Sequence, residues 1–220
     1  MRVATCLWTN GGDLPRFSAG VYDESYVDAL RRGLARHWPQ AELEVLRDED
    51  FAERNWPGWW RRFEAFRPEF WPEGSERLVL LDLDQILVGD CSWLGEWSEA
   101  PVGLPRDPFF PDLACSTIIS VDREGAELLW KAATTVKPTA YQYMGAPSEM
   151  ALLRTLAKRH GWAPLEPEPK KLLSYKVHVL RERMPWEDAS IVYFHGKPKP
   201  ADLKADDPLR LAWQGLPVST

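Results

Sequence analysis

A run of apolar residues that ends in two closely spaced carboxylates constrains the fold of this chain more than any other feature. Residues 78–81 read Leu-Val-Leu-Leu, and Asp82 and Asp84 follow with only Leu83 between them. An unbroken apolar run is typical of a strand buried on both faces, as in a parallel sheet covered by helices. Because side chains alternate along a strand, we expect both carboxylates to project to one side.

The two carboxylates allow two interpretations. Unpaired carboxylates at the end of a buried strand repel each other and are costly to remove from water, and a divalent cation would relieve both effects. In open α/β sheets ligands also bind beyond the carboxyl ends of the strands. These arguments predict a metal site that holds an anionic substrate. The alternative is a strand end at the surface with two solvated aspartates, and Asp-x-Asp alone is too short to decide.

Composition excludes several classes of protein. With 220 residues the chain is expected to form one domain, and a net charge of −6 without a long basic run disfavours nucleic acid as a partner. Cys6, Cys91 and Cys115 are odd in number and form no Cys-x-x-Cys pair, which indicates a reducing compartment rather than a disulfide framework. No apolar run is long enough to span a membrane and no signal-peptide pattern is present, so we expect a cytoplasmic location.

Predicted strands and helices alternate along the chain. Strands are predicted over 3–8, 43–46, 78–88, 101–104, 116–121, 174–180 and 191–194, and helices over 23–38, from about 55, from 122 and over 148–160. This order favours an α/β fold with a mainly parallel sheet. We expect a single domain over 1–200 and a surface segment over 201–220.

Two basic features stand out. The turn that follows the last strand carries His195, Gly196 and Lys199, which suit a metal ligand, a close backbone approach and a phosphate contact. A solvated basic turn is the alternative. Arg62 flanks a predicted aromatic helix face, and an arginine there needs an anionic partner, either a bound phosphate or a carboxylate.

Taken in order, these motifs resemble GT-A glycosyltransferases, closest to glycosyltransferase family eight and related bacterial and phage proteins. The resemblance runs over most of the chain and rests on residues 8–12, 56–63, 81–90, 174–178 and 194–200. It implies a GT-A-type, Rossmann-like domain with a mainly parallel central sheet flanked by helices.

The resemblance also implies roles for the acidic and basic turns. Asp82 and Asp84 match the Asp-x-Asp pair that binds a divalent metal, Mn²⁺ or Mg²⁺, and His195 would be the third protein ligand. Gly196 and Lys199 match a Gly-x-x-Lys-Pro motif whose lysine contacts the diphosphate of a sugar nucleotide.

Further residues match positions around the donor. Arg62 falls where the family has a basic residue near the donor phosphates or sugar, and Glu149 falls near the transferred sugar, so both are catalytic candidates. Thr9 and Asn10 fall on the loop beside the nucleotide base, and Asp48 is a further candidate there.

The implied function is a metal-dependent transfer of a sugar from a nucleoside-diphosphate sugar, expected to be a UDP-sugar. The acceptor is an unspecified glycan, lipid or small molecule, and the resemblance favours retention of configuration. Two alternatives remain. One is a sugar-nucleotide or glycan-binding protein without turnover, whose tryptophans would stack on sugar rings. The other is a haloacid-dehalogenase-type phosphatase, although Gln85 and Ile86 replace the usual Gly-Thr after Asp-x-Asp.

Overall fold

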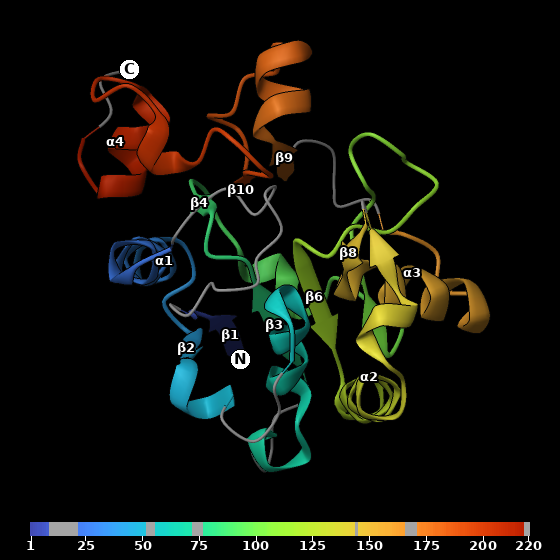
Figure 1. Cartoon of the computed structure of the whole chain (residues 1–220). Coiled ribbons are helices and arrows are strands. Elements are labelled where there is room, and N and C mark those ends of the chain that lie inside the picture. Colours follow the sequence, from blue (N-terminus) through green and yellow to red (C-terminus); the bar gives the residue numbers. More distant parts are fainter. Residues whose placement is uncertain (9–21, 52–55, 72–76, 144, 166–170, 218–220) are drawn as a thin grey trace.

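The computed structural model of the chain describes residues 1–8, 22–51, 56–71, 77–143, 145–165 and 171–217. Its central element is a five-stranded sheet in the order β2-β1-β3-β6-β5, shown in Figure 1. The strands are β1 (Arg2–Cys6), β2 (Glu42–Leu46), β3 (Leu78–Leu81), β5 (Val102–Gly103) and β6 (Ile118–Val121). β1 pairs in parallel with β2 and β3, whereas β6 is antiparallel to both β3 and β5. The predicted α/β fold with a mostly parallel central sheet is confirmed.

A second, smaller sheet lies beside the end of β3. It contains β4 (Gln85–Leu87), β10 (Ile191–Tyr193) and β9 (Leu172–Ser174) in the order β4-β10-β9. β10 is antiparallel to β4 and parallel to β9. A short hairpin of β7 (Gln142–Tyr143) and β8 (Ala146–Pro147) completes the strands of the described part of the chain.

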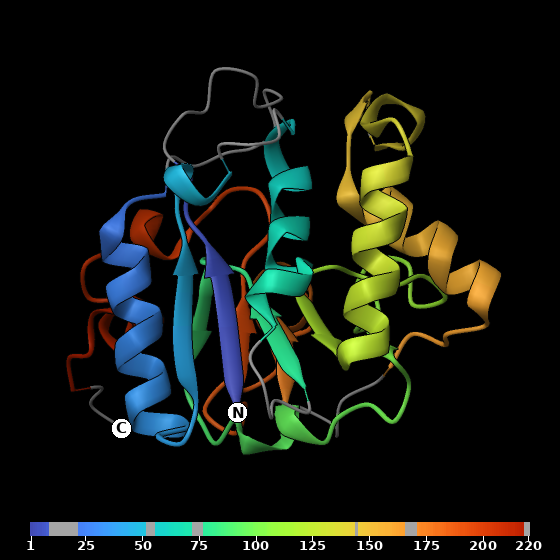
Figure 2. The ribbon, with the colours of Figure 1, turned by 90° about the horizontal axis from the view of Figure 1, so that it is seen from below.

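Helices cover the central sheet, as Figure 2 shows from below. The α-helices are α1 (Glu24–His37), α2 (Arg123–Thr135), α3 (Glu149–His160) and α4 (Pro208–Gln214). The 3₁₀ segments are η1 (Asp48–Phe51), η2 (Gly58–Phe66), η3 (Pro68–Phe70), η4 (Ser92–Gly95), η5 (Pro138–Ala140) and η7 (Pro200–Asp202).

The alternation of side chains along the strands decides which core each residue joins. Ala4 of β1 and Leu80 of β3 pack with Phe63 of η2 in one buried cluster, whereas Val3 and Val79 pack with α1 in another. The central strands are therefore buried on both faces, as their unbroken apolar run predicts.

Local signals set several helix ends. The Asp23 carboxylate accepts a hydrogen bond from the Ser25 N–H at 2.9 Å and starts α1, and Asp122 does the same for α2 through the Gly125 N–H at 2.7 Å. Gly161 ends α3 with φ of 70°, in the left-handed region that favours glycine.

The structure corrects two predicted strands. β3 ends at Leu81, so Asp82 and Asp84 lie in a turn between β3 and β4 rather than on one continuous strand. The segment predicted as a strand over 174–180 instead forms η6, a π-helix (Tyr175–Arg181). Ser174 starts η6 because its hydroxyl accepts the Val177 N–H at 3.2 Å, while its own N–H is donated to the Nδ1 atom of His178 at 2.9 Å. Backbone and side-chain groups are thus satisfied locally, without a partner strand.

Residues 201–217, for which the sequence predicts a surface segment, include α4. Leu209 and Trp213 of α4 are buried with Tyr26 and Val27 of α1. No helix of the described residues is long and apolar enough to cross a membrane.

Candidate functional site

The site is built around the acidic turn, residues 82–84, which connects the central sheet to the second sheet. Two backbone hydrogen bonds hold this turn: the Asp82 N–H donates to the Thr117 carbonyl at 3.3 Å, and the Phe194 N–H donates to the Asp84 carbonyl at 3.0 Å. The Gln85 side-chain amide also donates to the Thr117 carbonyl at 2.6 Å. The turn is therefore fixed between the residue before β6 and the residue after β10.

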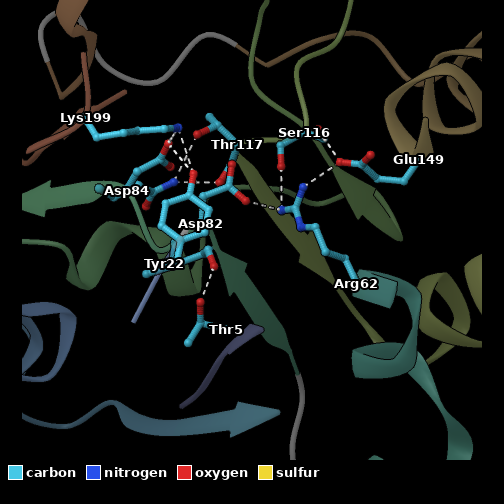
Figure 3. Close-up of polar contacts among 11 residues, drawn as sticks. Thr5, Tyr22, Arg62, Asp82, Asp84, Ser116, Thr117, Glu149 and Lys199 are labelled. Carbon is cyan, nitrogen blue, oxygen red and sulfur yellow. Dashed lines mark hydrogen bonds and ion pairs between the residues drawn. The ribbon is translucent and has the colours of Figure 1, made fainter. Parts of the chain in front are cut away.

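Asp84 pairs with Lys199 in the interior of the protein. The Nζ atom of Lys199 forms an ion pair with Oδ2 of Asp84, and both side chains are buried. The Tyr22 hydroxyl donates to the same carboxylate oxygen at 2.9 Å and accepts a hydrogen bond from Lys199 Nζ at 2.8 Å (Figure 3). Asp202 holds the Lys199 backbone by accepting its N–H at 2.8 Å. The acidic turn and the late basic turn thus meet in one place, as the sequence motifs require.

Arg62 forms a second charged group beside Asp82. Its Nη2 atom lies 3.0 Å from Oδ1 of Asp82 and donates to the Ser116 carbonyl at 2.7 Å, while Nη1 donates to Glu149 at 2.8 Å. The Ser116 hydroxyl donates to the same Glu149 oxygen at 3.0 Å. Figure 3 shows Arg62 between the two carboxylates. Of the two partners that the sequence left open for Arg62, the structure supplies carboxylates.

Negative charge exceeds positive charge among these residues. The two groups contain three carboxylates, Asp82, Asp84 and Glu149, and two cations, Arg62 and Lys199. With all of them ionised, one negative charge is not balanced within these two groups. Asp82 is the accessible carboxylate, because its side chain is 31% exposed. Burial raises the pKa of Asp82, against the opposing effect of Arg62, and Asp84 raises it further. A cation bound near Asp82 would lower this pKa and stabilise the ionised carboxylate.

His195 is the second residue after β10, and Asp84 and Lys199 both influence its pKa. Its Nε2 atom is 2.7 Å from the Ser174 hydroxyl, and its ring meets the ring of Phe109 edge to face at 5.1 Å. Burial lowers the pKa of His195 to about 4, so the imidazole is neutral at neutral pH. Gly196 follows with φ of 66°, a conformation that favours glycine at this turn.

The three predicted metal ligands do not form a preassembled metal site. Among the described residues, no group of three His, Cys, Asp or Glu side chains is close enough to hold a metal ion. Asp82 and Asp84 are engaged by Arg62 and Lys199, and His195 by a serine hydroxyl.

The remaining predicted positions are less defined. Thr9 and Asn10, expected beside the nucleotide base, lie outside the described residues. Asp48 begins η1, two residues after the end of β2, and its carboxylate is 3.4 Å from the guanidinium of Arg61.

Tyr22 and Ser116 belong to the site, although the sequence reasoning assigned them no role. Ser116 could have been noticed as a polar residue at the start of a predicted strand, at the same edge of the sheet as Asp82. Tyr22 offers no such signal, because it becomes part of the site only through its contacts with Asp84 and Lys199.

The fold matches that of GT-A glycosyltransferases in solved structures. Two glycosyltransferases with solved structures share it. The apo form of GlyE from Streptococcus pneumoniae TIGR4 superposes with a TM-score of 0.64 and 14% identity over 97% of this chain. Galactosyltransferase LgtC, solved with donor and acceptor sugar analogs, superposes with a TM-score of 0.58 and 10% identity over all of this chain and 98% of LgtC.

The chain spans 59% of the GlyE chain. No protein-family model and no curated protein sequence matches it. At these identities the similarity establishes the shared fold. It confirms the GT-A resemblance that the sequence motifs predicted.

Proposed function

We propose that this protein is a glycosyltransferase that moves a sugar from a nucleoside-diphosphate sugar, expected to be a UDP-sugar, to an acceptor hydroxyl. The observation that carries the proposal is the pairing of Asp84 with Lys199 and of Asp82 with Arg62 at the end of the central strand of a GT-A fold. The similarity to GlyE and LgtC supports the choice of a glycosyltransferase over a phosphatase.

The two cations suit the charge that develops in this reaction. The acceptor oxygen bonds to the anomeric carbon, while the bond from that carbon to the diphosphate breaks and leaves its electron pair on the phosphate oxygen. The proton of the acceptor hydroxyl is taken up by the released diphosphate. Lys199 and Arg62 are fixed by their partners before substrate arrives, and cations held in place stabilise a developing negative charge most effectively.

Glu149 would face the transferred sugar in a fixed orientation. Two hydrogen bonds, from Arg62 and Ser116, reach the same oxygen of Glu149 and fix the orientation of its carboxylate. We include retention of configuration in the proposal because of the resemblance to family eight. Proton NMR of the first product, taken before mutarotation, distinguishes retention from inversion.

A divalent cation, Mn²⁺ or Mg²⁺, at Asp82, Asp84 and His195 stays a prediction. The excess carboxylate charge favours it, and oxygen ligands with one imidazole suit these ions. Such an ion would supply charge neutralisation for a bound diphosphate. Since the three residues are not grouped as ligands, we assign no reaction step to it.

A nucleotide-release assay tests the proposal. Purified protein is incubated with Mn²⁺, a panel of sugar nucleotides and simple sugar acceptors, and free nucleoside diphosphate is measured. We expect release from a UDP-sugar. The Asp84→Asn variant should be inactive at a temperature where circular dichroism shows it folded, although it is less stable because Lys199 loses its partner. Binding of UDP without release would instead support a non-catalytic sugar-nucleotide protein. Phosphate release from p-nitrophenyl phosphate would support a phosphatase.

Equilibrium dialysis of Mn²⁺ in the presence of UDP tests the metal prediction. Binding by the wild type that is lost in Asp84→Asn supports it, and equal binding by both proteins contradicts it. The acceptor and the cytoplasmic location also stay predictions.

A further inference from the structure

The loop between β5 and β6 exposes three large apolar side chains within five residues. This loop, residues 105–114, is called the Phe109 loop. The exposed fraction is 49% for Phe109, 54% for Phe110 and 41% for Leu113. The loop is the yellow-green segment near β8 in Figure 1. Single exposed apolar residues are ordinary on protein surfaces, whereas a group of them marks a binding surface.

The Phe109 loop holds these side chains outward by a set of internal hydrogen bonds. The buried carboxylate of Asp107 accepts the N–H groups of Phe109 and Phe110 at 2.8 and 3.0 Å. Arg154 of α3 donates to the other Asp107 oxygen at 2.6 Å and to the Ala114 carbonyl at 2.8 Å. The exposure of the apolar side chains is thus fixed by the fold, and a ligand that binds them need not order the loop first.

The Phe109 loop adjoins the charged site, which consists of Asp82, Asp84, Arg62, Glu149 and Lys199, at two points. Its C-terminal end leads within two residues to Ser116, whose carbonyl and hydroxyl bond to Arg62 and Glu149. Its tip returns to the site at His195, where the Phe109 ring lies 5.1 Å away. A ligand that reaches from the charged site toward this loop would therefore place a polar end near Asp82 and an apolar end on Phe110 and Leu113.

Charge argues against an anionic membrane as the occupant. The loop carries Arg106, Asp107 and Asp112, which is no excess of positive charge, and the whole chain has a net charge of −6. Binding to an anionic lipid surface depends on clustered basic residues. A small amphiphilic ligand accounts for both the apolar tip and its position beside the charged site.

We propose that the Phe109 loop binds an apolar group attached to the acceptor, an alkyl or aryl aglycone, while the acceptor hydroxyl faces Asp82 and Arg62. This inference rests on the proposed function and names the class of its acceptor: a glycoside or other hydroxyl compound with an apolar substituent. Phe109 lies at the junction, and Phe110 and Leu113 form the outer part of the surface.

Calorimetry with simple glycosides tests the inference. The wild type is saturated with UDP and titrated with methyl and octyl β-glucoside, and with methyl and octyl β-galactoside, below the concentration at which octyl glycosides form micelles. Burial of the alkyl chain on the loop should make each octyl glycoside bind roughly tenfold or more tightly than its methyl counterpart. Equal binding of octyl and methyl forms in both sugars would overturn the inference.

Two variants locate the effect. The double variant Phe110→Ser, Leu113→Ser should lose the preference for octyl glycosides and keep the affinity for UDP. Leu216→Ser is the matched control, because Leu216 is 47% exposed but follows α4, which packs against α1. It should keep the preference. A preference that survives the double variant would place the alkyl chain elsewhere and contradict the inference.

Other occupants of the loop give different results. If wild type, but not the double variant, sediments with phosphatidylcholine vesicles or dimerises in size-exclusion chromatography, the loop binds lipid or a second copy, and the acceptor assignment is wrong. UDP titration separates this inference from the proposed function. Bound UDP with no alkyl preference refutes only the acceptor class, whereas absence of binding to any nucleoside diphosphate refutes the glycosyltransferase itself.

Discussion

Lys199 and Asp84 are separated by 115 positions in the chain, yet their side chains form a buried ion pair at the end of the central strand. Burying two charges is costly, and the pair is tolerated because the Tyr22 hydroxyl forms hydrogen bonds with both partners. This relationship connects the acidic turn to the C-terminal part of the chain, and it places a cation where a diphosphate is expected.

Removal of one partner should destabilise the protein more than removal of both. We expect Lys199→Met to lower the free energy of unfolding by about 3–5 kcal/mol, because Asp84 is left buried without its cation. The double variant Lys199→Met, Asp84→Leu should recover part of this loss. Urea denaturation of the three proteins measures the difference. A double variant less stable than Lys199→Met would contradict the explanation. Lys197→Met is the control, because the Lys197 side chain is 60% exposed and its ion pair with Asp202 should contribute at most about 1 kcal/mol.

Lys199 should distinguish a diphosphate from a bare nucleoside. If its ammonium contacts the diphosphate, Lys199→Gln should weaken binding of UDP by roughly tenfold, the value of one charge-assisted hydrogen bond, and leave the affinity for uridine nearly unchanged. Isothermal titration calorimetry with both ligands measures this. Lys197→Gln, two residues away, should bind UDP as the wild type does. Equal losses for UDP and uridine in Lys199→Gln would exclude a phosphate contact.

Arg62 should not be replaceable by lysine. Its planar guanidinium bonds at once to Asp82, Glu149 and the Ser116 carbonyl, a geometry that a single ammonium cannot reproduce. Arg62→Lys keeps the charge but leaves buried acceptors without a donor, so we expect a loss of about 1–3 kcal/mol in the free energy of unfolding. Arg61→Lys is the neighbouring control, with an expected loss below about 1 kcal/mol because the Arg61 side chain is 19% exposed, against 5% for Arg62. Similar values for the two variants would refute the bridging role of Arg62.

His195 should make the stability of the protein depend on acid pH. The folded protein holds the pKa of His195 at about 4, below the usual value of 6.5. Between pH 6.5 and 4 the unfolded chain therefore binds a proton that the folded protein does not, and stability falls as the pH is lowered. His195→Gln lacks this group, so the wild type should lose more stability than the variant between pH 7 and pH 5. Urea unfolding at several pH values measures the difference, and NMR of the His195 ring measures its titration directly. If the stability of the wild type and of His195→Gln changed equally with pH, the His195 ring would have the same pKa in the folded and unfolded protein, and the prediction would be wrong.

Local sequence patterns predicted those helices and strands that depend on interactions between residues close together in the chain. The apolar run of β3 and the helices α1, α2 and α3 lie where the sequence placed them. The segment after Ser174 was predicted wrongly, since apolar residues at every second position also occur in η6 and hydrogen bonds from Ser174 decide between the two structures.

The residues of the candidate site also fall into two sets, those that the sequence predicted and those that only the structure revealed. The sequence motifs and the family resemblance together pointed to Asp82, Asp84, Arg62, Glu149 and Lys199. The structure brings all five into two adjoining charged groups. Tyr22 and Ser116 could not be found from spacing, because their contacts join segments that only the folded chain brings together.

By itself the sequence determined the α/β architecture and the chemical types at the site, because strand burial, helix capping and charge are properties of short segments. Only the tertiary structure decided which cation neutralises which carboxylate. It also decided which side of the site carries the exposed phenylalanines. These choices depend on distances across the sheets between residues far apart in the chain, and hydrophobic burial over the whole domain fixes those distances.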